Sequence, residues 1–223
     1  MRGGRFRCVA VISGPWRSLP ARGKSGALRA AARLERWHGR QNPGVGSPQT
    51  LSEQERRTVA GWAADCAERV VGLFESSVPG DPRPRDAIAR TRAFANGELE
   101  VSDEIRRRFA GAGAASGVSP AAAAAARAAG QASAVAHMGA HALGAAAYAA
   151  KAVGLAEPAK PDALANEVEW QLSVMSADVR AALRKLPPVG HDRSGPLGPG
   201  LLASGMLGAV IHELQDSLTE PEH

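Results

Sequence analysis

An alanine-rich stretch in the middle of the chain constrains the fold more than any other feature. Eight of the nine residues 121–129 are alanine. Alanine has the highest helix propensity, and the near absence of β-branched residues here also favours helix over strand. Ser119-Pro120 reads as an N-cap followed by proline at the first helical position, so we expect one long helix from there to Gly154. Because methyl groups bury little apolar area, its stability must come from close approach to neighbouring helices, which predicts a central position.

The rest of the chain also favours helices. Ser52-x-x-Glu55 is a capping box, and a helix is expected from there to about Ser77. Only 4% of all residues are aromatic, which argues against an all-β or α/β fold. Apolar residues recur at spacings of three and four, and they predict further helices over 83–96, 102–116, 161–185 and 204–218. We therefore predict a single all-α bundle of five to six helices over residues 51–218.

The charge of the chain is unevenly distributed. Residues 1–48 contain ten Lys/Arg and one Asp/Glu, whereas the remaining 175 residues contain 17 Lys/Arg and 21 Asp/Glu. Nucleic-acid affinity depends mostly on neutralising phosphates, so an acidic body argues against nucleic acid as its main partner. The Gly-, Arg-, Ser- and Pro-rich segment 1–50 is predicted to be a disordered basic tail, or residues added by an upstream start codon.

Cysteine and hydropathy patterns narrow the protein class further. Cys8 and Cys66 are the two cysteines, so no disulfide framework is indicated. No apolar run approaches the roughly 20 residues of a membrane span, and the piece 8–12 is too short for a signal-peptide core. We expect a cytoplasmic protein.

The expected long helix carries a polar stripe. At roughly 100° per residue, His137 and His141 lie about 40° apart, with Tyr148 between them in angle and Ser133 and Lys151 beside them. A solvated polar face is one interpretation of the stripe, and a surface for a protein partner is another.

A metal site is the third interpretation of the two histidines. Two histidines spaced by four can bind a metal, but a site needs a third ligand and usually a fourth. His137 is not followed by glutamate, so the zinc-protease pattern is absent. Residues that could complete such a site are Cys66, Asp65, Glu167 and His191.

The first predicted helix of the bundle carries acidic candidates for partner binding. Asp65 and Glu68 lie away from its apolar stripe, whereas Cys66 lies on the stripe and is expected to be an inert buried thiol. In the helix predicted over 161–185, Glu167 and Trp170 could form a surface pair, but the preferred interpretation is that Trp170 packs at an edge between helices. None of these residues completes a catalytic constellation.

The order of the motifs resembles a known family. The segments are LSEQERRTVAGWAADCAERVVGLFE, PGDPRPRDAIARTRAFANGE, AARAAGQASAVAHMGAHALGAAAYAAKA and EWQLSVMSADVRAALRKLPP. Over about residues 51–186 they resemble the immunity-protein-five-like family of bacterial immunity proteins. The resemblance implies an all-α domain and protection against a polymorphic toxin, and His137, His141 and Tyr148 match a recurrent pattern of that kind. It implies no catalytic residue.

These observations together predict a protein that binds and neutralises a toxin stoichiometrically through an acidic helical surface. Because many toxins are basic nucleases, opposite charge would speed association. We expect no cofactor, no catalytic residue and no membrane partner, and a homo-oligomer is left open. One alternative is a metal-dependent enzyme that uses His137 and His141. The other is a nucleic-acid-associated protein that uses the basic arm, which carries Arg29, Arg33, Arg36 and Arg40.

Overall fold

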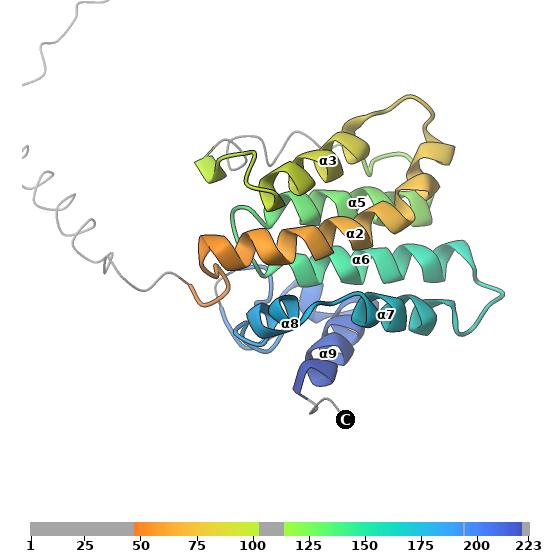
Figure 1. The fold of residues 1–223 in the computed structure, drawn as a ribbon. Helices are drawn as coiled ribbons and strands as arrows, with labels where there is room; N and C mark the ends of the chain where they lie inside the picture. Colours follow the sequence, from red (N-terminus) through yellow and green to blue (C-terminus); the bar gives the residue numbers. More distant parts are fainter. Residues whose placement is uncertain (1–46, 103–113, 194, 220–223) are drawn as a thin grey trace, which may run out of the picture. The chain divides into compact units, whose positions relative to one another are not determined.

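A computed structural model describes residues 47–102, 114–193 and 195–219 (Figure 1). In these ranges the regular structure consists of seven α-helices and one short 3-10 helix, with no strand, which confirms the predicted all-α class. Most of the helix predicted over 102–116 and nearly all of the predicted basic tail fall outside the described residues. The elements are α2 (Glu53–Ser77), α3 (Arg83–Ala95), α5 (Pro120–Ala134), α6 (His141–Ala156), α7 (Ala163–Ser173), α8 (Ala177–Leu183), η1 (Leu201–Ala203) and α9 (Gly205–Thr219).

The helices α2, α3 and α9 lie where the sequence predicts them. The backbone N–H of Glu55 donates to Ser52 Oγ and that of Ser52 donates to the Glu55 carboxylate, so the predicted capping box opens α2. The helix α3 ends before Gly97, which has a φ of 82°, in the left-handed region that glycine tolerates best. The apolar residues whose spacing predicts α9 are buried: Leu207, Val210, Ile211, Leu214 and Leu218.

The single long alanine-rich helix predicted from Pro120 to Gly154 is wrong. Two helices, α5 and α6, take its place, separated by a turn over residues 135–140, and they lie side by side in opposite directions (Figure 1). Ten of the sixteen residues of α6 are buried, most of them alanine. Small side chains let two helix backbones approach closely, so the folded-back pair forms the alanine-packed centre.

A segment just before α2 explains why the helix breaks there. The backbone N–H groups of Gly139 and Ala140 donate to the carbonyls of Thr50 and Gln49, each at 3.0 Å. The Leu51 side chain fills the space in which a Cβ at position 139 would stand, 2.5 Å from Leu51 Cδ1. Residues 47–51, which we call the strap, therefore supply the hydrogen bonds and packing that a continuous helix would have made with itself.

The single helix predicted over residues 161–185 is also wrong, because two helices, α7 and α8, take its place. The chain turns at Val174, and the Ser176 hydroxyl accepts a hydrogen bond from the backbone N–H of Val179 to begin α8. The Arg180 guanidinium donates to the carbonyl of Leu172 at the end of α7, at 2.7 Å. A second N-cap and a satisfied carbonyl thus make two short helices more favourable than one.

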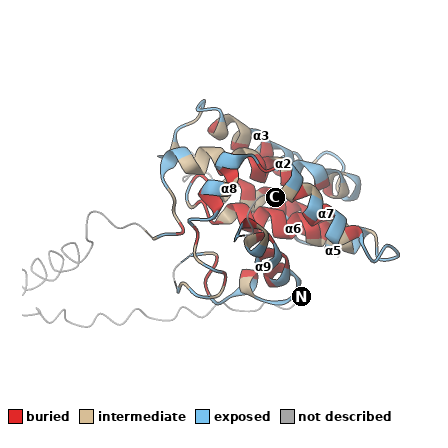
Figure 2. Cartoon of the chain, turned by 60° about the horizontal axis from the view of Figure 1, so that its bottom comes forward, coloured by how far each residue is buried: buried red, intermediate tan, exposed pale blue. Residues whose placement is uncertain are grey.

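The helix α6 lies at the centre of the bundle. It packs against α2 and α5 on one side and against α7 and α9 on the other, while α3 covers α2 and α5. Figure 2 shows the buried positions concentrated along α5, α6 and the inner face of α2. The central position of α6 therefore places its side chains against several neighbouring helices.

Within the described part of the chain, no helix is both long enough and apolar enough to span a bilayer.

Candidate functional site

The two histidines that motivated the metal interpretation do not share a helix. His137 is exposed in the turn between α5 and α6, and His141 is the first residue of α6. The polar stripe expected from Ser133 to Lys151 is therefore broken. The Ser133 hydroxyl donates to its own helix, to the Gly130 carbonyl at 2.9 Å.

The second half of the stripe does belong to a site. His141 and Tyr148 are two turns apart on one face of α6, and both line a cleft of about 380 Å³. Gln131 of α5 forms another part of the lining, and Arg193 with the glycine- and proline-rich loop between Gly195 and Leu202 forms the rest. The cleft thus combines two residues that the sequence predicted, His141 and Tyr148, with two that it did not, Gln131 and Arg193.

A short contact orders the inner end of this cleft. His141 Nδ1 lies 2.7 Å from Gln131 Oε1. Because an amide oxygen only accepts, His141 carries its proton on Nδ1 and keeps a lone pair on Nε2. The absence of a side chain at Gly144 leaves room for this contact, since a Cβ there would lie 2.5 Å from Gln131 Oε1 and 3.0 Å from Leu202 Cδ1.

Burial shifts the titration of both α6 residues in the cleft. Loss of solvent, and then the charge of His137, lower the pKa of His141 to about 4, so the imidazole is neutral at pH 7. Burial raises the pKa of Tyr148, against an opposing effect from the charge of Arg127, so the phenol is also neutral and keeps its proton. The Tyr148 side chain can therefore donate a hydrogen bond, whereas His141 Nε2 can accept one.

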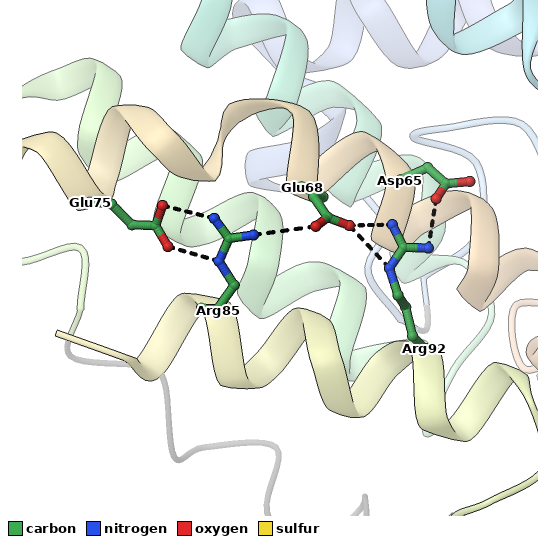
Figure 3. A network of polar contacts seen from close by, with 5 residues as sticks. All are labelled: Asp65, Glu68, Glu75, Arg85 and Arg92. Carbon is green, nitrogen blue, oxygen red and sulfur yellow. Dashed lines mark hydrogen bonds and ion pairs between the residues drawn. The ribbon is translucent and has the colours of Figure 1, made fainter. Parts of the chain in front are cut away.

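The acidic candidates Asp65 and Glu68 occupy a different part of the molecule. Figure 3 shows them on α2 in a row with Glu75, bridged by Arg85 and Arg92 of α3. Arg85 contacts Glu75 at 2.8 Å and Glu68 at 3.2 Å, while Arg92 contacts Asp65 at 2.8 Å and also Glu68. We call these five residues the charged ladder. Each carboxylate in it already has an arginine partner.

The other potential metal ligands are dispersed or engaged. Cys66 is buried, and desolvation followed by the charges of Glu167 and Asp65 raises its thiol pKa well above the usual range. This agrees with an inert thiol. His191 is exposed in the loop after α8. Across residues 47–102, 114–193 and 195–219, no group of three or more His, Cys, Asp or Glu side chains could hold a metal ion.

Glu167 and Trp170 do not form the surface pair that was one interpretation of the sequence, because Glu167 is buried. Its side chain accepts a hydrogen bond from Arg69 Nε at 2.6 Å, and the same guanidinium lies 4.1 Å from the centre of the Trp170 ring. A larger cavity of about 470 Å³ opens beside this pair, and Lys160 and Glu157 on its lining are also ion-paired. Because most of its charges are paired, this cavity is a weaker candidate than the cleft beside α6.

Two residues of the site left a faint signal in the sequence. Gln131 is an isolated amide residue at the end of an alanine-rich run. A polar side chain contributes little to packing there, so its presence is a weak sign of another role. Arg193 stands in a glycine- and proline-rich loop, and loops carry binding residues more often than the elements that they connect. Neither signal indicates which residues would lie across the cleft from Gln131 or Arg193.

Comparison with known proteins adds one match. The family model described as "Imm-5 like putative immunity protein" matches residues 49–178, more than half of the chain. The match begins at Gln49 of the strap and includes Gln131, His141 and Tyr148, whereas the loop with Arg193 follows it. Neither the curated proteins nor the solved structures include a match to the chain. On the family match, the chain belongs to the Imm-5-like family of immunity proteins.

Proposed function

We propose that this protein binds and neutralises a polymorphic bacterial toxin by forming a stoichiometric complex with it. The observation that carries the proposal is the family match over residues 49–178, which extends from the strap into the beginning of α8. Membership of an immunity-protein family implies a toxin as the partner. The rigid alanine-packed centre supports such a role, because a preorganised surface loses little conformational entropy on binding.

We further propose that the docking surface is acidic. Residues 49–223 hold 17 Lys/Arg and 21 Asp/Glu, and opposite charge would speed the encounter with a basic toxin. On the charged ladder, Asp65 and Glu68 are already bridged, so cationic groups of a toxin would compete there with Arg85 and Arg92.

A second acidic group lies on α9. Glu213 and Asp216 are exposed, and neither makes an ion pair with another described residue. They offer carboxylates to a basic toxin without displacing an existing partner. The two groups, on α2 and on α9, can be compared directly by mutation.

The test is co-expression with candidate toxins taken from the reading frames that neighbour the gene of this protein. The wild-type protein should restore growth and co-purify with the toxin as a complex of fixed stoichiometry. The double variant Glu213→Gln, Asp216→Asn should slow association at low salt more than Asp65→Asn, Glu68→Gln does, because only the α9 carboxylates lack a partner. Growth arrest without any complex would overturn toxin neutralisation. Equal association rates for wild type and both variants would overturn the acidic surface alone.

A further inference from the structure

We propose that the cleft formed by Gln131, His141, Tyr148 and Arg193 is a binding site for a carboxylate group. This goes beyond the proposed function, because that function concerns an acidic docking surface, whereas this cleft presents hydrogen-bond donors and a positive charge. Binding of a carboxylate in this cleft can be measured on the isolated protein and does not depend on a toxin.

The first observation is the state of the Tyr148 side chain. It is 4% exposed and lines the cleft. Its hydroxyl makes no hydrogen bond to any other residue that the structure describes. The hydroxyl is not one of the buried polar atoms that lack a partner in the described part of the chain, so it is open to the cleft, where solvent or a ligand can accept its hydrogen bond. Since burial raises the pKa of the phenol, the hydroxyl keeps its proton and can donate it to an acceptor.

The second observation is the arrangement around Tyr148. The Gln131 oxygen is taken by His141 Nδ1, which leaves the Gln131 amide N–H groups as donors beside the same cleft. Arg193 adds a guanidinium to the lining. Tyr148, Gln131 and Arg193 therefore offer hydrogen-bond donors, whereas His141 Nε2 is an acceptor. Because a carboxylate only accepts hydrogen bonds, we assign it to the part of the cleft between Tyr148 and Arg193.

The charge of the lining selects the class of ligand. Among the described residues, Arg193 is the charged side chain that lines the cleft, and no carboxylate does. The nearby Asp192 carboxylate accepts a hydrogen bond from the buried Gln49 amide at 3.1 Å. One guanidinium binds one planar carboxylate group in a two-pronged contact, so a single carboxylate of the ligand is expected to enter the cleft. The apolar side chains of Pro196 and Leu202 also line the cleft, and they can pack against a short hydrocarbon chain of the ligand.

The chain offers an unusually direct probe of this site, because Tyr148 is its single tyrosine. Incorporating 3-fluorotyrosine into the full-length protein gives one fluorine resonance, which reports on the cleft alone. Succinate is added at constant pH and ionic strength, with chloride as the matched salt. A saturable shift with succinate, and none with chloride, is the expected result. The absence of a saturable shift overturns the proposal.

Variants assign the binding to the named groups. Arg193→Gln should weaken succinate binding at least tenfold, because it removes the one charged donor of the lining. Arg83→Gln removes an exposed arginine from the first position of α3, which does not line the cleft, and should leave the affinity unchanged. Equal weakening by both variants would show general charge attraction and would overturn the site.

A second measurement tests whether the Tyr148 hydroxyl contributes to binding. Tyr148→Phe removes the probe, so its succinate affinity is measured by calorimetry, with the thermal midpoint of unfolding as a check that the variant is folded. A folded Tyr148→Phe protein with wild-type affinity would show that the hydroxyl does not bind the carboxylate and would overturn the proposed arrangement of donors. About tenfold weaker binding would support it.

The carboxylate has two natural sources, a free small acid or an acidic side chain of a protein partner. Adding the toxin to the fluorinated protein distinguishes them. If the toxin shifts the Tyr148 resonance and succinate reverses the shift, the carboxylate belongs to the toxin. If the toxin binds without moving the resonance while succinate still does, the site serves a free acid. Toxin binding with no response to succinate supports toxin neutralisation and overturns the carboxylate site.

Discussion

The charged ladder on α2 and α3 and the cleft beside α6 are both rich in polar residues, yet they differ in how those residues are partnered. In the ladder, Asp65, Glu68 and Glu75 are bridged by two arginines at the surface. In the cleft, Tyr148 is nearly buried and His141 keeps a free lone pair. A polar group with a partner inside the protein has less to gain from a ligand. The comparison therefore favours the cleft as the place where binding chemistry remains available.

The largest expected effect concerns pH and His141. Because the folded pKa is about 4 against an ordinary 6.5, the unfolded chain takes up a proton between these values that the folded protein does not. The contribution of His141 to stability is complete above pH 6.5 and is lost as the pH falls to 4, by about 3 kcal/mol. Chemical denaturation at pH 7 and pH 4 should show a loss that is about 3 kcal/mol smaller in His141→Gln than in wild type, since lowered carboxylate pKa values such as that of Glu55 contribute equally to both.

The exposed His191 provides the control for this measurement. His191→Gln, which removes a histidine that does not line the cleft, is measured alongside as the matched variant. Parallel curves for wild type and His141→Gln would show that His141 is not desolvated in the folded protein, and the contrast between cleft and ladder would then lose its strongest support.

The next prediction compares how tightly the helices that carry the two regions, α6 and α3, are packed. Ala146 on α6 is fully buried between helices, whereas Ala89 on the ladder helix α3 is exposed. Ala146→Leu should lower the free energy of unfolding by about 2–3 kcal/mol, because added methyl groups do not fit a close helix contact. Ala89→Leu should change it by less than about 0.5 kcal/mol, since both residues favour helix. Equal effects would mean that α6 is not the packed centre.

A smaller effect is expected at Gly144. A methyl group there would lie 2.5 Å from Gln131 Oε1, the end of a flexible side chain that can move away. Gly144→Ala should therefore cost about 1 kcal/mol and break the contact between Gln131 and His141. Gly130, with nothing within 4 Å of an added Cβ, is the matched control. Gly130→Ala should stabilise the helix by about 0.5–1 kcal/mol, and both are read from thermal unfolding. A neutral Gly144→Ala with unchanged His141 titration would contradict the role proposed for this glycine.

The differences between the predicted and the observed fold have a common physical reason. The sequence predicts the stripe on α9 and the capping box of α2 correctly, because those patterns are local. The break after α5 depends on the strap, which lies far earlier in the chain and leaves no signal in the alanine-rich stretch itself. The break between α7 and α8 had a local sign in Ser176, but the continuous apolar stripe suggested a longer helix.

The same division between local and distant information holds for the candidate site. The spacing of seven between His141 and Tyr148 places them on one face whether or not the helix continues before them, so the sequence could identify them together. Their neighbours Gln131 and Arg193 come from a helix that folds back and from a loop beyond α8, which spacing cannot reveal. Likewise, Asp65 and Glu68 were predicted as exposed acids, but their arginine partners on α3 are a consequence of tertiary packing.

The smallest expected effect separates a stabilising ladder from a binding surface. The ladder side chains are 39–46% exposed, so Arg92→Gln should lower the free energy of unfolding by less than about 1 kcal/mol, and the difference should shrink in high salt. The same variant releases Asp65 and part of Glu68 from their partner. If the toxin docks there, Arg92→Gln should strengthen toxin binding at low salt, whereas Arg83→Gln, which leaves the ladder intact, should not. An unchanged toxin affinity would show that the ladder stabilises α3 against α2 and is not the acidic docking surface.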